Sequence, residues 1–153
     1  DETANIKLAA KRIVWGKFIN AGQTCIAPDY LLVQKDIKSD LIEHLKQEIT
    51  SAYSDDPEVS PDYTRIVNTR NWDRLKSLIE PEKVLFGGQI NSEDCYLAPT
   101  LIDEIRGGWV YYVRGGPIGS QRNSRYGHKY PTNTAFPSEF SYSKFRKKTY
   151  SVV

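Results

Sequence analysis

The chain begins with a helical pattern that ends at a glycine, and this boundary limits how the following residues can fold. Between Thr3 and Asn20 the apolar positions recur at helical spacing, at Ile6, Ala10, Ile13, Val14 and Phe18. Trp15 and Phe18 are expected to be packing residues. Gly22 permits a sharp chain reversal, and the apolar run at residues 30–33 is typical of a buried strand. The sequence therefore predicts a helix, a tight turn and a strand, in that order.

Two more helices are predicted downstream. Asp36 can cap a helix that ends near Tyr53, and its apolar face is formed by Leu41, Leu45, Ile49 and Ala52. Asn68 can cap a third helix that runs through Ile79 and buries Trp72, Leu75 and Leu78. Residues 84–88 and 96–102 are predicted to be strands on either side of a polar turn. Strands and helices in this order indicate an α/β fold.

The two parts of the chain differ in charge. Residues 1–105 carry twelve Lys and Arg against eighteen Asp and Glu, whereas residues 106–153 carry nine against one. The second part is rich in Gly, Tyr and Ser, and neither the helical nor the strand period persists in it. It has few aliphatic side chains whose burial could offset the entropy lost on ordering. We therefore predict a folded domain at residues 1–105 and an irregular, poorly ordered tail at residues 106–153.

Cys25 lies just after the predicted turn, where the first helix has ended and the strand has not begun. A single thiol in such a place is either a small, inert apolar residue or a nucleophile. Cys25 and Cys95 are the two cysteines of the chain, too few for a disulfide framework, so a reducing compartment is expected. The sequence has no apolar run of membrane-spanning length and no leader, which makes the cytoplasm the predicted location.

The sequence around Cys25 resembles the active-site signature of the aldehyde dehydrogenase superfamily. The matching residues are Phe18, Gly22, Gln23, Thr24, Cys25, Ile26 and Ala27. The continuation to Tyr30 is similar to the class 3 and fatty aldehyde branch of that superfamily. Residues 65–75 and 96–102 follow in the family's order, so the resemblance covers about residues 1–103. It implies a partial catalytic domain with a parallel sheet flanked by helices.

The resemblance implies that Cys25 is the catalytic nucleophile. In the family a cysteine thiolate attacks the aldehyde carbonyl, hydride passes to NAD or NADP, and water releases the carboxylic acid. The backbone N–H of Cys25 would donate to the developing oxyanion. The family's general-base glutamate and its dinucleotide-binding domain precede this segment, so we expect no cofactor-binding residues in the chain and no turnover by the chain alone. An aldehyde substrate and a second copy of the chain in a homodimer are the implied partners.

Two alternative interpretations give the chain no catalytic role. In one, the tail binds nucleic acid or another acidic partner, because cations and aromatic rings together suit single strands. The residues concerned are Arg122, Arg125, Tyr126, Lys129, Tyr130, Tyr142, Lys144, Arg146, Lys147, Lys148 and Tyr150. In the other, the chain is a non-catalytic oligomerisation piece. On the dehydrogenase interpretation neither nucleic acid nor a membrane is an expected partner, and the cysteines and histidines lack the spacing of a metal site.

Overall fold

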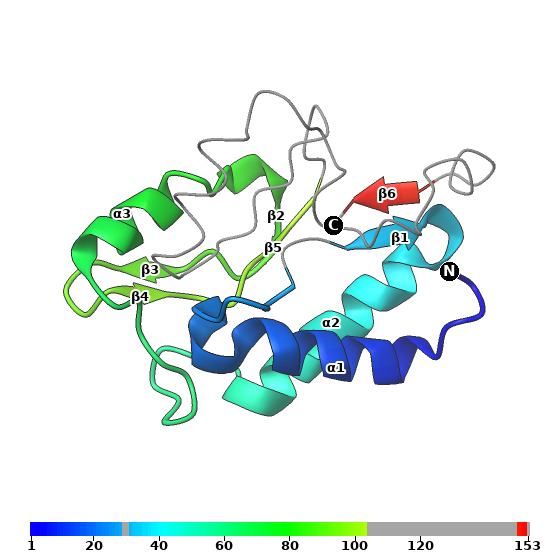
Figure 1. The fold of residues 1–153 in the computed structure, drawn as a ribbon, viewed down its shortest axis with the longest axis horizontal. Coiled ribbons are helices and arrows are strands. Elements are labelled where there is room, and N and C mark those ends of the chain that lie inside the picture. Colours follow the sequence, from blue (N-terminus) through cyan, green and yellow to red (C-terminus); the bar gives the residue numbers. More distant parts are fainter. Residues whose placement is uncertain (29–30, 104–149, 153) are drawn as a thin grey trace.

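The computed structural model describes residues 1–28, 31–103 and 150–152. Its helices are α1 (Ile6–Phe18), α2 (Lys38–Tyr53) and α3 (Thr69–Lys76), and its 3₁₀ turns are η1 (Ile19–Gly22), η2 (Lys35–Ile37) and η3 (Pro81–Lys83). Its strands are β1 (Leu32–Gln34), β2 (Val84–Phe86), β3 (Ile90–Asn91), β4 (Tyr96–Leu97), β5 (Leu101–Ile102) and β6 (Tyr150–Val152). Helices α1 and α2 form one side of the molecule, and α3 lies with the β3–β4 pair on the other (Figure 1).

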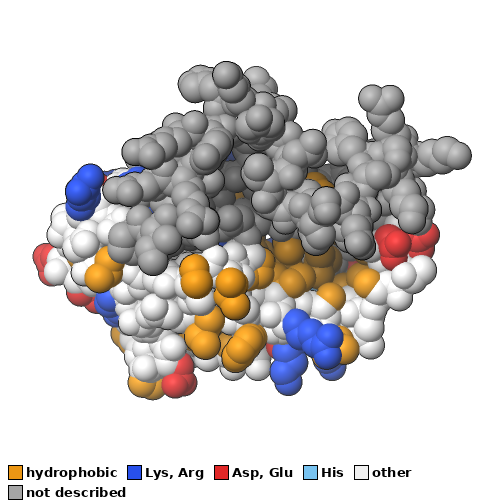
Figure 2. Space-filling view, in the orientation of Figure 1, with side chains coloured by type: hydrophobic (Ala, Val, Ile, Leu, Met, Phe, Trp, Pro, Cys, Tyr) orange, Lys and Arg blue, Asp and Glu red, His pale blue; other side chains and the backbone are white. Residues whose placement is uncertain are grey.

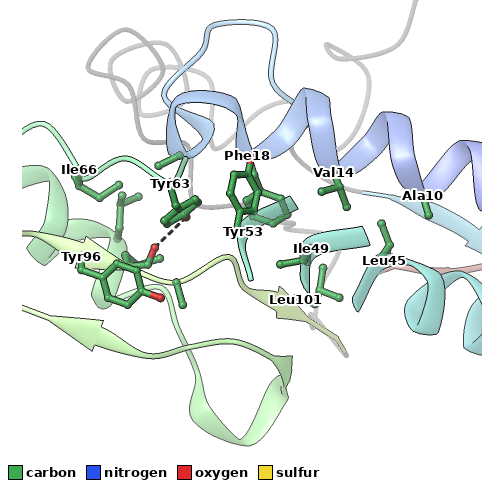
Figure 3. Packing of buried hydrophobic residues seen from close by; sticks show 14 of the residues in the cluster. Ala10, Val14, Phe18, Leu45, Ile49, Tyr53, Tyr63, Ile66, Tyr96 and Leu101 are labelled. Carbon is green, nitrogen blue, oxygen red and sulfur yellow. Dashed lines mark hydrogen bonds between the residues drawn. The ribbon is translucent and has the colours of Figure 1, made fainter. Parts of the chain in front are cut away.

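The first helix follows its predicted pattern except at Trp15. Asn5 caps α1, since its side-chain oxygen accepts a hydrogen bond from the N–H of Leu8 at 3.0 Å. The buried face of α1 packs against α2 and the residues around β4 and β5 (Figure 3). The buried hydrophobic residues of the two helices are Ala10, Val14, Phe18, Leu41, Leu45, Ile49 and Tyr53. Trp15 is 69% exposed, so its expected packing role was wrong. One residue turns a helix by about 100°, which moves Trp15 off the face that Val14 buries.

The predicted N-cap of α2 was wrong, whereas the predicted N-cap of α3 is confirmed. Asp36 lies inside η2, and the residue at the N-cap of α2 is Ile37, which makes no side-chain capping bond. The 3₁₀ turn directly before α2 therefore displaces the predicted cap. Asn68 does cap α3, because its Oδ1 accepts a hydrogen bond from the N–H of Asn71 at 2.9 Å. Helix α3 ends at Lys76, earlier than the pattern predicted.

The strand pairs that the structure describes are antiparallel, so the described residues do not show the expected parallel sheet. β1 pairs with β6, β2 with β5, and β3 with β4, in three separate two-stranded sheets. Only residues 92–95 connect β3 to β4, and a connection this short pairs strands antiparallel, whereas a parallel pair needs a longer crossover. Residues 96–102, predicted as one strand, divide into β4 and β5 at Pro99, which has no N–H for a ladder.

The C-terminal residues contribute one strand to the described structure. β6 lies antiparallel to β1, with Leu32 opposite Val152 and Gln34 opposite Tyr150. Residues 106–149 and 153 lie outside the described residues, so the poorly ordered tail stays a prediction. In the described ranges, no helix has the length and apolar character needed to cross a bilayer.

Candidate active site

Cys25 follows a stretch of left-handed backbone at the end of α1. Asn20 and Ala21 have φ/ψ values of 52°/36° and 50°/36°, and Gly22 continues the run with φ 74°. Glycine adopts this conformation without penalty, but for Ala21 it costs about 1–2 kcal/mol. Strained backbone of this kind gathers at functional sites, where the surrounding structure maintains it. This local geometry therefore marks the segment before Cys25 as a candidate site.

The thiol is carried at the tip of a tight turn. The N–H of Ala27 donates to the carbonyl of Thr24 at 3.1 Å, so Cys25 and Ile26 occupy the two central positions. Both side chains point outward: Cys25 is exposed, and Ile26 is 87% exposed. An inert apolar role for Cys25 requires burial, so the exposed thiol favours the nucleophile. We call residues 20–27 the cysteine turn.

The apolar surface is not limited to Ile26. Hydrophobic side chains gather across one face of the molecule, beside a group of Lys and Arg side chains (Figure 2). The exposed large apolar residues include Leu8, Trp15, Ile19, Ile26, Val59 and Val67. Three of them, Leu8, Trp15 and Ile19, follow the outer side of α1 into η1. Ile26 adds an exposed apolar side chain next to Cys25 along the chain.

Gln23 ties the cysteine turn to a distant part of the chain. Its Nε2 donates to the carbonyl of Asn20 at 3.1 Å and to the carbonyl of Arg65 at 2.9 Å. Its Oε1 accepts from the N–H of Val67 at 2.9 Å. The sequence motif included Gln23 but gave it no role. No signal in the sequence could have supplied that role, because both distant partners are main-chain atoms, 42 and 44 residues away.

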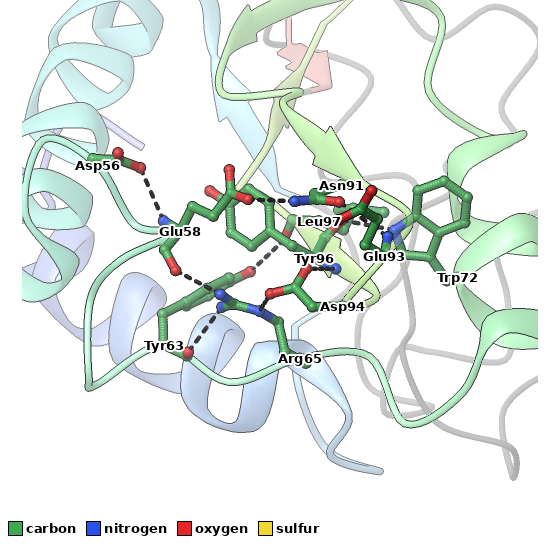
Figure 4. A network of polar contacts seen from close by, with 10 residues as sticks. All are labelled: Asp56, Glu58, Tyr63, Arg65, Trp72, Asn91, Glu93, Asp94, Tyr96 and Leu97. Carbon is green, nitrogen blue, oxygen red and sulfur yellow. Dashed lines mark hydrogen bonds and ion pairs between the residues drawn. The ribbon is translucent and has the colours of Figure 1, made fainter.

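The carbonyl of Arg65 accepts the hydrogen bond from Gln23, and the side chain of Arg65 is held by several partners (Figure 4). Its Nε donates to Asp94 Oδ2 at 2.6 Å, and its two terminal nitrogens donate to the carbonyls of Glu58 at 2.5 Å and Tyr63 at 3.3 Å. Its guanidinium lies 4.9 Å from the centre of the Tyr96 ring. We call Arg65 and these four partners the Arg65 cluster. It fixes the backbone at residue 65 to the β3–β4 pair.

The tyrosines of this cluster are structural groups at neutral pH. The Tyr63 hydroxyl donates to the carbonyl of Leu97 at 3.0 Å. Burial raises the pKa of Tyr63, and the pKa of Tyr96 is raised to about 12, first by burial and then by the charges of Asp56 and Glu58. Both hydroxyls therefore stay protonated at neutral pH and are unsuited to accept a proton from a reacting group.

The described residues do not fit a bound dinucleotide. A phosphate cradle places a glycine-rich loop between a strand and a helix. Gly87 and Gly88 follow β2 but lead into β3, and a Cβ built at Gly87 would lie 1.9 Å from the carbonyl oxygen of Pro99. That backbone faces Pro99 and not a ligand. Among the described side chains, no group of three His, Cys, Asp or Glu is arranged to hold a metal ion.

Comparisons with known proteins decide the ancestry. A family model described as the aldehyde dehydrogenase family matches residues 1–107. The chain belongs to the aldehyde dehydrogenase family. This confirms the resemblance inferred from the residues around Cys25. The solved structure titled "Substrate bound state of Staphylococcus Aureus AldH" is 43% identical, with a TM-score of 0.71 over 76% of this chain and 26% of that one. The α/β aldehyde dehydrogenase-like fold is thereby supported as well.

Curated relatives include members of the predicted branch. The 4,4'-diaponeurosporen-aldehyde dehydrogenase of Staphylococcus aureus is 48% identical over 69% of this chain and 23% of its own length. Aldehyde dehydrogenase family 3 member A2 of Mus musculus is 39% identical over 69% of this chain and 22% of its own length. The dimeric NADP-preferring aldehyde dehydrogenase of Bos taurus is 41% identical over 69% of this chain and 44% of its own length. The chain thus spans from about a quarter to less than half of these dehydrogenases.

The alternative role in nucleic-acid binding gains no support. Arg122, Lys148 and the basic residues between them lie outside the described residues. The family match ends at residue 107 and concerns the dehydrogenase domain. That interpretation and the non-catalytic oligomerisation piece stay untested predictions.

Proposed function

We propose that Cys25 is the nucleophile of an aldehyde dehydrogenase that oxidises an aldehyde to a carboxylic acid. The observation that carries this proposal is an exposed thiol at the tip of a strained turn, inside the segment that matches the family. Sulfur suits this chemistry because a thiolate is a strong nucleophile and a good leaving group from a thioester. Ile26, beside the thiol and exposed, favours an aldehyde with an apolar chain.

The step assigned to this chain is the formation of a thiohemiacetal. The Cys25 S–H bond breaks and its proton is released, Sγ forms a bond to the carbonyl carbon, the carbonyl π electrons move to oxygen, and that oxygen takes up one proton in place of the one that the thiol released. Oxidation of this adduct requires a hydride acceptor, NAD or NADP in the family. The described residues do not form a cradle for either, so no later step is assigned to them. Cys25 must stay reduced to react, which favours a reducing compartment such as the cytoplasm.

A homodimer is the further proposal for assembly. It is supported by a relative from Bos taurus that is named dimeric and is 41% identical over the shared segment. Sedimentation of the chain at several concentrations would measure this directly. A monomer at every concentration would contradict it.

The proposed nucleophile can be tested without cofactor. Hexanal should form a reversible adduct with Cys25 and thereby slow its alkylation by iodoacetamide, followed by peptide mass spectrometry. Cys95 is half-buried and is the internal control within the same molecule. We expect hexanal to protect Cys25 and leave the rate at Cys95 unchanged. Hexanol, which has the same chain but no carbonyl, should protect neither thiol.

Two outcomes would contradict this assignment. Equal protection of both thiols would show a general reaction of aldehyde with cysteine, and no protection of Cys25 would show that the turn does not favour the adduct. The variant Cys25→Ser removes the reacting sulfur and serves as the blank for the Cys25 peptide. A short peptide with the sequence of residues 23–27 gives the reference rate for the same thiol outside the fold.

A further inference from the structure

The side chain of Gln23 bridges two points of a distant backbone. Its amide nitrogen donates to the carbonyl of Arg65, and its oxygen accepts from the N–H of Val67. The two partners fix the orientation of the amide, because a flipped amide would bring oxygen to oxygen and N–H to N–H. Gln23 therefore contacts residues 65–67 as a neighbouring peptide group would.

The cysteine turn also contains local hydrogen bonds. The N–H of Gln23 donates to Asn20 at 3.0 Å, and the N–H of Ala27 donates to Thr24 at 3.1 Å. Bonds between residues three apart shape the turn but cannot place it relative to the rest of the fold. The two bonds from Gln23 to the distant backbone do so, and one of them ends on Arg65, whose side chain the Arg65 cluster holds.

Gln23 is also close to the thiol along the chain. Thr24 is the one residue between Gln23 and Cys25. The strained backbone at Asn20 and Ala21 lies on the other side of Gln23 and would relax toward more favourable φ/ψ values if it were released. A misplacement of about 1 Å at a reacting group can cost on the order of 100-fold in rate. Loss of the two distant partners of Gln23 would therefore allow the backbone that carries Cys25 to shift.

We propose that Gln23 is a positioning residue for Cys25, acting through its paired hydrogen bonds to the backbone of Arg65 and Val67. This inference rests on the proposed role of Cys25 as the nucleophile. Gln23 acts only through the backbone and does not itself touch the aldehyde. Its loss should leave the thiol in place chemically but no longer fixed in space.

Two variants separate the two halves of the bridge. Gln23→Met keeps the length of the side chain but can neither donate nor accept in this way. Gln23→Glu keeps an oxygen for the N–H of Val67 but cannot donate to the carbonyl of Arg65. Gln47→Met makes the same chemical change at an exposed position of α2 and is the matched control.

Amide hydrogen exchange at Val67 measures how well its N–H is protected by the hydrogen bond to Gln23. We expect exchange to rise on the order of tenfold in Gln23→Met, because one hydrogen bond is lost, and to stay near the wild-type rate in Gln23→Glu. A general loss of stability would raise exchange in both variants, so this difference isolates the hydrogen bond. The concentration of hexanal that half-protects Cys25 should rise several-fold in Gln23→Met and stay unchanged in Gln47→Met.

The outcomes distinguish this inference from the proposed function. If hexanal protects Cys25 equally in the wild type and in Gln23→Met, the positioning role is overturned while the nucleophile stands. If hexanal does not protect Cys25 even in the wild type, the proposed function fails, and Val67 exchange alone decides whether Gln23 holds the turn. Unchanged Val67 exchange in Gln23→Met overturns the bridge itself. Should Gln23→Met fail to fold, rapid Val67 exchange in a folded Gln23→Glu would overturn it equally.

Discussion

The cysteine turn and the Arg65 cluster lie at the two ends of one hydrogen bond and are built in opposite ways. The cysteine turn is exposed at its tip and has left-handed backbone at two non-glycine residues, Asn20 and Ala21. The Arg65 cluster is built on buried rings, with Tyr63 6% and Tyr96 1% exposed, and on a guanidinium whose donors find acceptors on three residues. One region carries the proposed nucleophile, and the other is a buried and densely hydrogen-bonded cluster.

This contrast predicts that substitutions at the tip of the cysteine turn alter reactivity without altering stability. A loop that presents a functional group is usually drawn from the less stable part of a fold and is positioned by a rigid scaffold. Substitutions around the Arg65 cluster should therefore change the free energy of unfolding, whereas substitutions at the tip of the cysteine turn should change reactivity alone.

The largest effect on the free energy of unfolding is expected at Gly87, which lies outside the cysteine turn. A Cβ at this position would lie 1.9 Å from the carbonyl oxygen of Pro99, and its φ of +76° disfavours any side chain. Gly87→Ala should lower the free energy of unfolding by at least about 3 kcal/mol, measured by urea denaturation. Gly16→Ala is the control, since a Cβ there meets Pro28 at an ordinary 3.7 Å. A Gly87→Ala protein as stable as the control would contradict the close contact.

A smaller loss of stability is expected when the Arg65 cluster loses its cation. Arg65→Met removes the bonds to Asp94, Glu58 and Tyr63 and leaves their oxygens without this donor. The free energy of unfolding should fall by about 2 kcal/mol. Arg70→Met, at an exposed position of α3, is the matched control and should change it by less than about 0.5 kcal/mol. Equal effects of the two substitutions on the free energy of unfolding would show that the Arg65 cluster does not stabilise the fold.

The buried tyrosines predict a loss of stability at high pH. The pKa of Tyr96 is about 12 in the folded chain, against about 10 for an exposed tyrosine. Between these values the unfolded chain has lost the proton that the folded chain keeps, so a rise in pH favours unfolding. This contribution is fully present below about pH 10 and is lost as the pH approaches about 12.

The measurement is urea denaturation of the wild type and of Tyr96→Phe at neutral pH and near pH 11. At the higher pH, the free energy of unfolding of the wild type should fall by about 1 kcal/mol relative to that of Tyr96→Phe, because phenylalanine has no proton to lose. A difference between the two proteins that is the same at both pH values would show that Tyr96 titrates normally. The cysteine turn contains no tyrosine, so this pH effect belongs to the scaffold alone.

The smallest effect on stability is expected at the thiol itself. Cys25→Ser changes one exposed atom and should alter the free energy of unfolding by less than about 0.5 kcal/mol. The same change should abolish alkylation of this peptide completely. Cys95→Ser is the contrasting control, since Cys95 is half-buried and has a φ of 57°. A large destabilisation by Cys25→Ser would break the separation between reactivity and stability.

The helices of this domain could be predicted because their determinants are local. The apolar period places α1, α2 and α3, and the Asn68 cap follows from a polar side chain three residues before its target N–H. The failures concern competition between neighbouring elements. Asp36 lost its capping role to a 3₁₀ turn, and Trp15 lies on the outer side of α1 in spite of its size.

The site could be predicted only in part. Gly22 and the position of Cys25 between helix and strand indicate a tight turn, but not that the thiol is exposed. The left-handed conformations of Asn20 and Ala21 could not be foreseen, because neither is a residue that requires them. Antiparallel pairing of β2 with β5 was also missed, since the resemblance suggested a parallel sheet and the strands are only two or three residues long.

The bridge from Gln23 has a consequence for how substitutions are tolerated on its two sides. The two distant hydrogen bonds of the amide end on main-chain atoms of residues 65 and 67, so neither of them involves the side chain of Val67. Almost any residue at position 67 can preserve the bridge, apart from proline, which has no N–H to offer. At position 23 the requirement is the reverse, because only a side chain with both a donor and an acceptor at that reach can make it. A complete substitution scan should therefore find one restrictive position facing one permissive position across the same pair of hydrogen bonds.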